Sequence, residues 1–256
     1  MLEWTSSNAA RYEGYENEAM REQVMDSLIS SAAMETIPAQ PETSRRRGVR
    51  SRGADQTRVN ILAAATAEFA DKGLAGARVD EIARKTATSK HMIYYYFGSK
   101  DGLYRAVLDE TYQNFRLAEQ TIDYAQLDPI EAMTSLAGLS FDFHVNNPAF
   151  VRIIMGENIN NGEHIQHVSN VEQRRAILTT MQEIATRGVA SGQFRTDIDV
   201  LDLHMTISAL CFYFVSNRFS FGHIFGLDLG AAEMISTRRI QVIDAVLSIC
   251  TPRRSL

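Results

Sequence analysis

The strongest constraint in the sequence is residues 78–100, RVDEIARKTATSKHMIYYYFGSK, which combine two short helical patterns. Val79, Ile82 and Ala83 repeat at i, i+3 and i+4 and give the first short helix one apolar face. Residues 86–88 interrupt this pattern before the second helix begins. This rhythm predicts a helix-turn-helix, in which two short helices pack about a tight turn.

The second of these helices has one face to bury and one to present. With Thr88 or Ser89 as the N-cap, a mostly apolar face is formed by Ser89, Ile93 and Phe97. A different face carries cationic, aromatic and hydrogen-bonding side chains: Lys90, His91, Tyr94 and Tyr95. We expect the first face to be buried and the second to be exposed.

The presented face suits the major groove of DNA. Lys90 can bind a phosphate or a guanine edge, and the hydroxyls of Tyr94 and Tyr95 can bond to phosphate oxygens. His91 and Met92 lie near the helix N-terminus, the end that recognition helices direct at base edges. The alternative is a helical hairpin in which the tyrosines only pack.

The segment TSKHMIYYYFGSKDGLYRAVL, residues 88–108, resembles the TetR family of transcriptional regulators, and the resemblance extends over residues 57–108. It follows that family's pattern of a short recognition helix ending in aromatic residues, a polar loop with Ser-Lys, and a long apolar helix. The sequence differs at His91 and Arg78, where the family often has Gly and Thr.

The resemblance implies a homodimer that binds a two-fold symmetric DNA operator, usually as a repressor. It also implies the mechanism of release: a small-molecule effector enters the helical domain, shifts the fourth helix and changes the separation of the two recognition helices.

Charge is distributed unevenly along the chain, whose formal net charge is −5. Residues 1–43 carry 2 basic and 8 acidic side chains, residues 44–105 carry 13 and 6, and residues 106–256 carry 11 and 17. Positive charge is therefore concentrated in the segment that contains the helix-turn-helix, as in modular DNA-binding proteins.

Residues 1–52 are predicted to form a flexible acidic extension that ends in a basic arm. The first 43 residues are polar and weakly patterned, and a later translation start at Met20, Met25 or Met34 would explain them equally well. The arm, SRRRGVRSRG, can follow a phosphate backbone or enter a narrow minor groove, with Arg46 and Arg50 as candidate contacts. A merely solvated linker is the alternative.

Residues 53–101 are predicted to form the helix-turn-helix DNA-binding domain, built from three helices. In its first helix Ile61, Ala65 and Phe69 repeat at i+4, and the Lys-Gly pair at residues 72–73 supplies a C-terminal stop. This helix is expected to form the floor on which the helix-turn-helix rests.

Two cations flank the recognition helix. Arg78 opens the preceding helix close to the backbone of bound DNA. Lys100 opens a fourth helix, expected to run to about residue 117, where its ammonium and the helix N-terminus together can hold a phosphate. The candidate DNA contacts are Arg46, Arg50, Arg78, Ser89, Lys90, His91, Met92, Tyr94, Tyr95 and Lys100.

Residues 102–256 are predicted to form a larger helical domain for ligand binding and dimerisation, so the expected fold is all-α. Helices are expected at residues 129–145, 148–158, 163–190, 200–221 and 229–249. Residues 200–221 are apolar over much of the helix circumference, which one intramolecular face cannot absorb. We therefore expect this helix, with the last one, to form a dimer interface, as the resemblance also implies.

Polar groups interrupt two apolar stretches of this domain, FVRIIMGENI at residues 150–159 and FYFVSNRFSF at residues 212–221. Such groups are either paired with one another, for example an arginine with Glu157, or kept for a ligand. The arginines and the aromatic side chains nearby favour a flat organic acid or aromatic catabolite as the effector. The candidate effector residues are Arg152, Asn158, His167, Phe212, Asn217 and Arg218.

His164 and His167 lie three residues apart near Glu163, a spacing compatible with metal ligation. Without a third convergent ligand, we interpret them as ordinary polar groups and expect no metal and no cofactor. The sequence also shows no Ser-His-Asp, Cys-His or paired-carboxylate arrangement, so we expect no enzymatic activity and no catalytic residues.

Cys211 and Cys250 are the only cysteines, and their apolar surroundings favour a reduced, cytoplasmic protein. The resemblance implies that this is the bacterial cytoplasm. No run approaches the roughly 20 apolar residues of a membrane span, and the N-terminus does not have the pattern of a signal peptide. Two other functions stay open: a ligand-independent architectural DNA-binding protein and, less favoured, a small-molecule enzyme or carrier.

Overall fold

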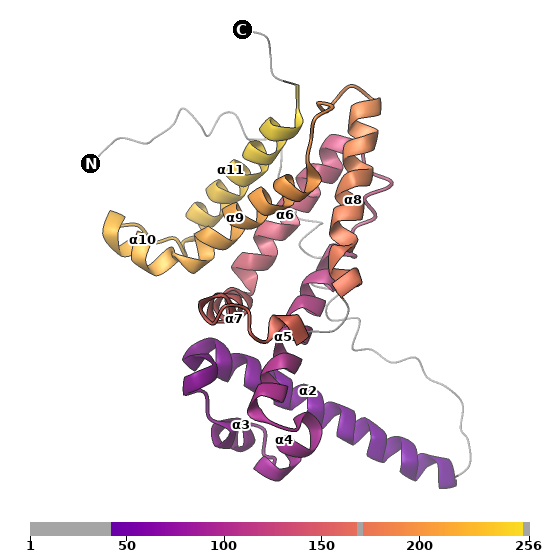
Figure 1. Cartoon of the computed structure of the whole chain (residues 1–256), viewed down its shortest axis with the longest axis vertical. Helices are drawn as coiled ribbons and strands as arrows, with labels where there is room; N and C mark the ends of the chain where they lie inside the picture. Colours follow the sequence, from indigo (N-terminus) through magenta and orange to yellow (C-terminus); the bar gives the residue numbers. More distant parts are fainter. Residues whose placement is uncertain (1–41, 168–170, 253–256) are drawn as a thin grey trace. The chain divides into compact units, whose positions relative to one another are not determined.

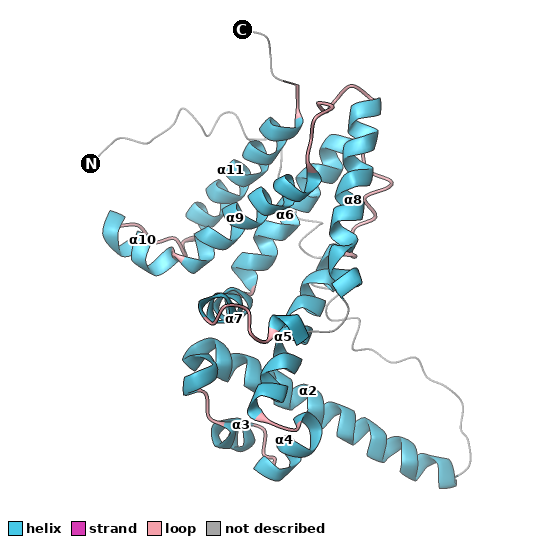
Figure 2. Ribbon diagram, viewed as in Figure 1, coloured by secondary structure: helices cyan, strands magenta, loops and turns pink. Residues whose placement is uncertain are grey.

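The computed structural model describes residues 42–167 and 171–252, which form helices joined by short connections (Figure 1). The contacts described below lie within residues 50–256, which form one compact unit of the chain. The all-α fold is confirmed (Figure 2). The elements are α2 (Glu42–Gly76), α3 (Val79–Lys85), α4 (Lys90–Phe97), α5 (Lys100–Glu119), α6 (Pro129–Asn146), α7 (Pro148–Ile159), the 3-10 helix η2 (Ile165–His167), α8 (Val171–Ala190), α9 (Val200–Ser216), α10 (Arg218–Phe225) and α11 (Ala232–Cys250).

Helix α2 is longer than the sequence predicted. Residues 45–52, expected to be an irregular basic arm, continue the helix instead. Arginine is a good helix former, and no proline interrupts the helix between this stretch and residue 57. The predicted stop at residues 72–73 is confirmed, because Gly73 has a φ of 66°, a left-handed value that favours glycine.

A first apolar core joins α2, α3, α4 and α5. Val79, Ile82 and Ala83 are buried in it, as their spacing predicted, and Ile93 of α4 is fully buried. At the two ends of the same α4 face, Ser89 is exposed and Phe97 is half-buried. Helices α2 and α5 contribute Ile61, Leu62, Ala65, Phe69, Leu103, Tyr104, Val107 and Leu108.

Helix α5 connects the first core to a second one. Leu103 and Leu108 belong to the first core, whereas Phe115, about two turns further along the helix, belongs to the second. The helix ends at Glu119, two residues beyond its expected end. One helix therefore contributes to both cores.

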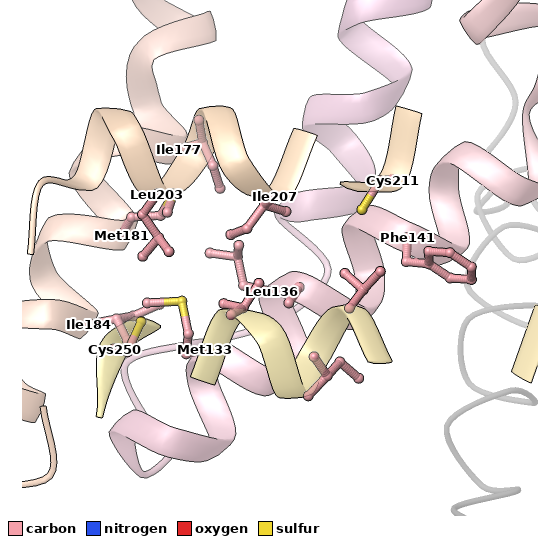
Figure 3. Packing of buried hydrophobic residues seen from close by; sticks show 14 of the residues in the cluster. Met133, Leu136, Phe141, Ile177, Met181, Ile184, Leu203, Ile207, Cys211 and Cys250 are labelled. Carbon is pink, nitrogen blue, oxygen red and sulfur yellow. The ribbon is translucent and has the colours of Figure 1, made fainter. Parts of the chain in front are cut away.

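Helix α6 lies at the centre of the second core, with α8, α9 and α11 packed against it (Figure 1). Its Met133, Leu136 and Phe141 are among the fully buried side chains. Figure 3 shows them with the side chains that they meet from the surrounding helices: Ile177, Met181, Ile184, Leu203, Ile207, Cys211 and Cys250. The two cysteines are buried free thiols, and burial raises the pKa of Cys211 to about 12.

The helix expected over residues 163–190 is divided. A turn at residues 160–162, with φ of 69° at Gly162, leads into η2, and α8 begins only at residue 171. The carboxylate of Glu157 accepts hydrogen bonds from the backbone N–H groups of His164 and Ile165. These donors are satisfied by a side chain rather than by a helical carbonyl, so the helix need not begin at residue 163.

The helix expected over residues 200–221 is also divided, and α10 is bent by 66° from α9. The Asn217 amide donates to the Tyr213 carbonyl at 3.4 Å and to Ser216 Oγ at 2.8 Å, which closes the end of α9. The last helix begins at residue 232, three residues later than expected. Among the described helices no single one is long and apolar enough to cross a membrane, and only the bent α9–α10 pair meets that test jointly.

Candidate nucleic-acid interface and ligand cavities

Helix α4 begins and ends at defined caps. Ser89 Oγ accepts a hydrogen bond from the Met92 N–H at 3.1 Å, which makes Ser89, rather than Thr88, the N-cap. Gly98 ends the helix with a φ of 76°, and Ser99 caps α5 by accepting from the Gly102 N–H at 2.9 Å. Two consecutive caps fix the direction in which α4 presents its outer face.

The outer face of α4 is open to solvent. Tyr95 is 75% exposed and Tyr94 37%, and His91 is also exposed, whereas Met92 is half-buried. Lys90 extends along the surface to Asp80 Oδ1 of α3 at 3.2 Å. This face matches the set of side chains that the sequence predicted to be presented.

The flanking cations take different positions. Arg78 is the exposed N-cap residue of α3, in an extended conformation. Lys100 is half-buried, and its Nζ donates to the Ala75 carbonyl at 3.2 Å. An ammonium has three donors, so this contact leaves capacity for a phosphate oxygen. The side chains of Arg46 and Arg50 lie outside the described residues, although their backbone belongs to α2.

A buried carboxylate that was not among the predicted site residues lies beneath the helix-turn-helix. Glu68 of α2 is 1% exposed and accepts hydrogen bonds from Lys72 at 2.7 Å, from Lys85 at 3.0 Å and from the Arg78 N–H at 3.3 Å. These bonds, that of Lys72 first, lower the pKa of Glu68 to about 2. Since Arg78 and Lys85 stand at opposite ends of α3, Glu68 fixes α3 on α2. The Glu68–Lys72 spacing of four residues was the only local signal for it.

A second buried carboxylate, Glu157, joins α5, α7 and the turn before η2. It accepts the His164 N–H at 2.6 Å, and His164 Nδ1 lies 3.5 Å from the other carboxylate oxygen. The rings of Tyr104 and His164 meet edge to face at 5.1 Å. Burial, and then the charge of Glu157, raise the pKa of Tyr104. In the structure Glu157 therefore binds backbone donors, whereas the sequence had suggested an arginine as its partner.

The predicted effector residues are dispersed. Arg152 and Asn158 are exposed on α7, and the Asn158 amide donates to the Ile154 carbonyl at 2.9 Å. His167 is exposed in η2. The remaining three lie near the end of α9: Phe212 is half-buried, Asn217 forms the junction with α10, and Arg218 covers the Phe219 ring at 4.5 Å.

Two cavities lie along α8 and the connection between α5 and α6, with volumes of about 650 and about 440 Å³. They share Tyr124 and Thr180 as wall residues, so one lies to each side of these side chains. None of the six predicted effector residues lines either cavity.

The smaller cavity contains a buried ion pair. Arg116 Nη1 donates to Glu119 Oε2, and Glu119 is 6% exposed. Burial raises the pKa of Glu119 to about 7 against the opposing effect of Arg116. Tyr124 is 7% exposed, and burial also raises its pKa. These residues were not among the predicted site residues; the i, i+3 spacing of Arg116 and Glu119 on one helix was the available signal.

Arg187 of α8 lines the larger cavity. Its guanidinium donates to the carbonyls of Tyr124 at 2.7 Å, Leu127 at 2.8 Å and Ala125 at 3.3 Å. These bonds tie the connection between α5 and α6 to α8. This arginine therefore serves the fold of the cavity wall.

An apolar surface extends over α9 and α10. Leu201, Met205 and Tyr213 of α9 are 59%, 63% and 53% exposed. Beyond the bend at Asn217, Phe219, Ile224 and Phe225 of α10 are also 60–71% exposed. Exposed apolar surface of this kind marks interaction sites.

Two family models match the chain. Residues 61–107 match the bacterial regulatory proteins of the tetR family, and residues 129–246 match the tetracyclin repressor-like C-terminal domain. The first match covers the helix-turn-helix and the beginning of α5, and the second covers α6 to most of α11.

Named relatives extend over most of the chain. The HTH-type transcriptional repressor NicS of Pseudomonas putida is 35% identical over 187 residues, 73% of this chain and 88% of NicS. The HTH-type transcriptional repressor KstR2 of Mycolicibacterium smegmatis is 32% identical over 148 residues, 56% of this chain and 70% of KstR2.

Solved structures show the same fold. The transcriptional regulator SCO4942 from Streptomyces coelicolor has a TM-score of 0.58 and 27% identity, over 77% of this chain and 99% of that one. A tetR-family regulatory protein from Rhodococcus RHA1 has a TM-score of 0.61 over 77% of this chain and 98% of that one, at 19% identity.

Proposed function

The chain belongs to the TetR family of transcriptional regulators, and on that basis we propose that it is a ligand-responsive repressor. It binds a palindromic operator as a homodimer and releases it when a small organic molecule binds the C-terminal domain. The observation that carries the proposal is the exposed polar-aromatic face of α4, held on a buried helix-turn-helix core. Relatives named as repressors, NicS and KstR2, support repression. Because its target is chromosomal DNA, its place of action is the cytoplasm.

We propose that α4 enters the major groove. His91 and Met92 of its first turn reach base edges, while Lys90, Tyr94 and Tyr95 bind phosphates or adjacent bases. Arg78, Ser89 and Lys100 flank the helix and position it on the backbone. Arg46 and Arg50 of α2 add phosphate contacts and affinity without setting the register.

The two proposed domains correspond to the two apolar cores. Residues 53–101 form the proposed DNA-binding domain, and residues 102–256 form the ligand-binding and dimerisation domain. The exposed apolar surface of α9 and α10, with the 37% exposed Ile249 of α11, supports a dimer through these helices. A two-fold dimer would place two copies of α4 against successive major grooves.

Helix α5 is the proposed route of the signal, because it contributes to both cores. Tyr104 couples it to Glu157 and His164 beside the first core, and Arg116 and Glu119 line the smaller cavity at its other end. If α5 can take two positions, an effector that binds better to one of them will favour that position. The fraction of dimers able to bind the operator will then change.

An aromatic acid is the effector class that the sequence favoured, with Arg152 or Arg218 as its partner. Exposure of the Arg152 side chain and the ring contact of Arg218 leave both guanidinium groups near solvent. The test is release of operator by aromatic acids in the wild type and in Arg152→Ala and Arg218→Ala. A concentration for release that rises roughly tenfold in one variant would identify the arginine.

The proposed function is tested by fluorescence anisotropy with duplexes from the region upstream of the protein's own gene, at several salt concentrations. We expect a dimer to bind one palindromic duplex more tightly than random DNA, with affinity falling steeply as salt rises. A monomer at micromolar concentration, or equal affinity for all duplexes, would contradict it.

A further inference from the structure

The far end of α5 holds a carboxylate that is only half satisfied. Arg116 donates to Glu119 Oε2, but Glu119 Oε1 has no hydrogen-bond partner among the described residues. The hydroxyl of Tyr124, on the connection after α5, likewise has no partner within the described ranges. Both side chains are more than nine-tenths buried, and both line the cavity of about 440 Å³.

Buried polar atoms in folded proteins nearly always have a hydrogen-bond partner, so two without one in the same cavity indicate a binding site. A ligand that donates to both atoms would satisfy them. The rest of the wall can hold an apolar body, because Ile122, Ala176 and Ile177 also line the cavity.

The charges of the wall select the kind of ligand. Arg116 is engaged by Glu119, and Asp123 adds a second carboxylate to the wall. On the other side of Tyr124, Arg187 is committed to three backbone carbonyls. The wall of this cavity therefore carries two carboxylates and one guanidinium, a balance of charge that disfavours an anion.

We propose that this cavity binds a small organic amine in its protonated form, whose ammonium donates to Glu119 Oε1 and to the Tyr124 hydroxyl oxygen. The assignment deepens the proposed function, on which it rests, by naming the effector class. It also differs from the aromatic acid that the sequence favoured. Glu119 is the last residue of α5, so the ligand would act on the helix that contributes to both cores.

The protonation of Glu119 gives the site a recognisable pH dependence. Its pKa is raised to about 7 by burial, and the charged or titratable groups around it are Arg116, Asp123, Tyr124 and, through Arg116, His204. The ammonium binds the ionised carboxylate, so amine affinity rises between pH 6 and 8 and binding releases a proton at the lower pH.

The test is isothermal titration calorimetry of the full chain with benzylamine and cyclohexylamine, and with benzoate and cyclohexanecarboxylate as probes of similar size and opposite charge. We expect the amines to bind and the carboxylates not to bind in this cavity. Glu119→Gln should weaken amine binding roughly tenfold or more, and Tyr124→Phe several-fold. Glu183→Gln, in the wall of the neighbouring cavity only, is the matched control and should leave it unchanged.

Failure of the amines to bind, or binding that Glu119→Gln does not weaken, would overturn the assignment. So would benzoate binding that is lost in Arg152→Ala or Arg218→Ala while no amine binds. Circular dichroism checks that each variant is folded, and Tyr124→Phe supplies the same test if Glu119→Gln is not.

Operator binding is measured separately, so that the two proposals fail in different ways. Glu119-dependent amine binding without operator release supports the site and contradicts the proposed regulation. Intact operator binding without amine binding contradicts the site alone.

Discussion

Two buried carboxylates, Glu68 at the helix-turn-helix and Glu119 at the far end of α5, are almost equally inaccessible to solvent but have opposite properties. Glu68 accepts from two lysines and a backbone N–H, and its pKa is lowered to about 2. Glu119 has one arginine, one oxygen without a partner in the described structure and a pKa raised to about 7. Burial alone therefore does not decide the charge of a carboxylate; the donors that it meets decide it together with burial.

The difference matches the proposed roles of the two regions. A fully satisfied carboxylate holds the helices that read DNA in one arrangement. A half-satisfied one, beside a cavity, leaves bonds for a ligand to complete. The following predictions test this contrast, in order of decreasing expected effect.

Glu68→Gln should lower the free energy of unfolding by about 2–3 kcal/mol at pH 7, because it removes charge-assisted bonds to a buried group. The two lysines are about 40% exposed, which limits the loss. Urea unfolding measures it. Glu81→Gln, which breaks the exposed pair with Arg84, is the control and should cost only about 0.3–0.5 kcal/mol. Equal losses of unfolding free energy in the two variants would show that the buried bonds of Glu68 stabilise the fold no more than the exposed pair does.

Opposite pKa shifts give opposite pH dependence. The stabilisation from Glu68 is complete above its ordinary pKa of 4.5 and is lost as pH falls towards about 2. In the folded protein the protonated form of Glu119 is the favoured one. Its contribution to stability is therefore complete below its ordinary pKa of 4.5 and is lost as pH rises towards 7. Between pH 5 and 8 the free energy of unfolding of the wild type should fall by about 2 kcal/mol relative to that of Glu119→Gln. Parallel stability profiles for the two proteins would refute the raised pKa.

At the DNA-binding end, Lys100→Ala should weaken binding to cognate and random duplexes equally, by about 1 kcal/mol, and reduce the salt slope by about one. His91→Ala should instead change the preference between operator variants by a similar amount. Anisotropy titrations separate these outcomes. If both variants bind every duplex like the wild type, α4 is not the recognition helix.

Tyr104→Phe should have the smallest effect of these substitutions. It removes a hydroxyl from beside Glu157 while keeping the ring contact with His164, so the free energy of unfolding should change by about 0.5–1 kcal/mol. We expect operator release to require more effector, because α5 is then less firmly coupled to α7. An unchanged release curve would remove Tyr104 from the coupling.

Periodicity and local chemistry were enough for much of the fold and of the α4 surface. The i, i+3, i+4 spacing of Val79, Ile82 and Ala83 and the cap at Ser89 are local features, and the structure agrees with them. The boundaries that were wrong depend on contacts from outside the helix, such as the Glu157 carboxylate that binds the N–H groups of His164 and Ile165.

The sequence by itself determined the all-α class, the family, the position of the helix-turn-helix and the concentration of positive charge around it. The class, the helix positions and the charge distribution follow from spacings of at most four residues and from composition, and the family follows from the resemblance over residues 57–108. Only the tertiary structure decided which carboxylates are satisfied, because Glu68 meets Lys85 across 17 residues and Arg187 meets the carbonyl of Tyr124 across 63. Burial and donor number, which set a pKa and open or close a binding site, are properties of such distant contacts and have no period in the sequence.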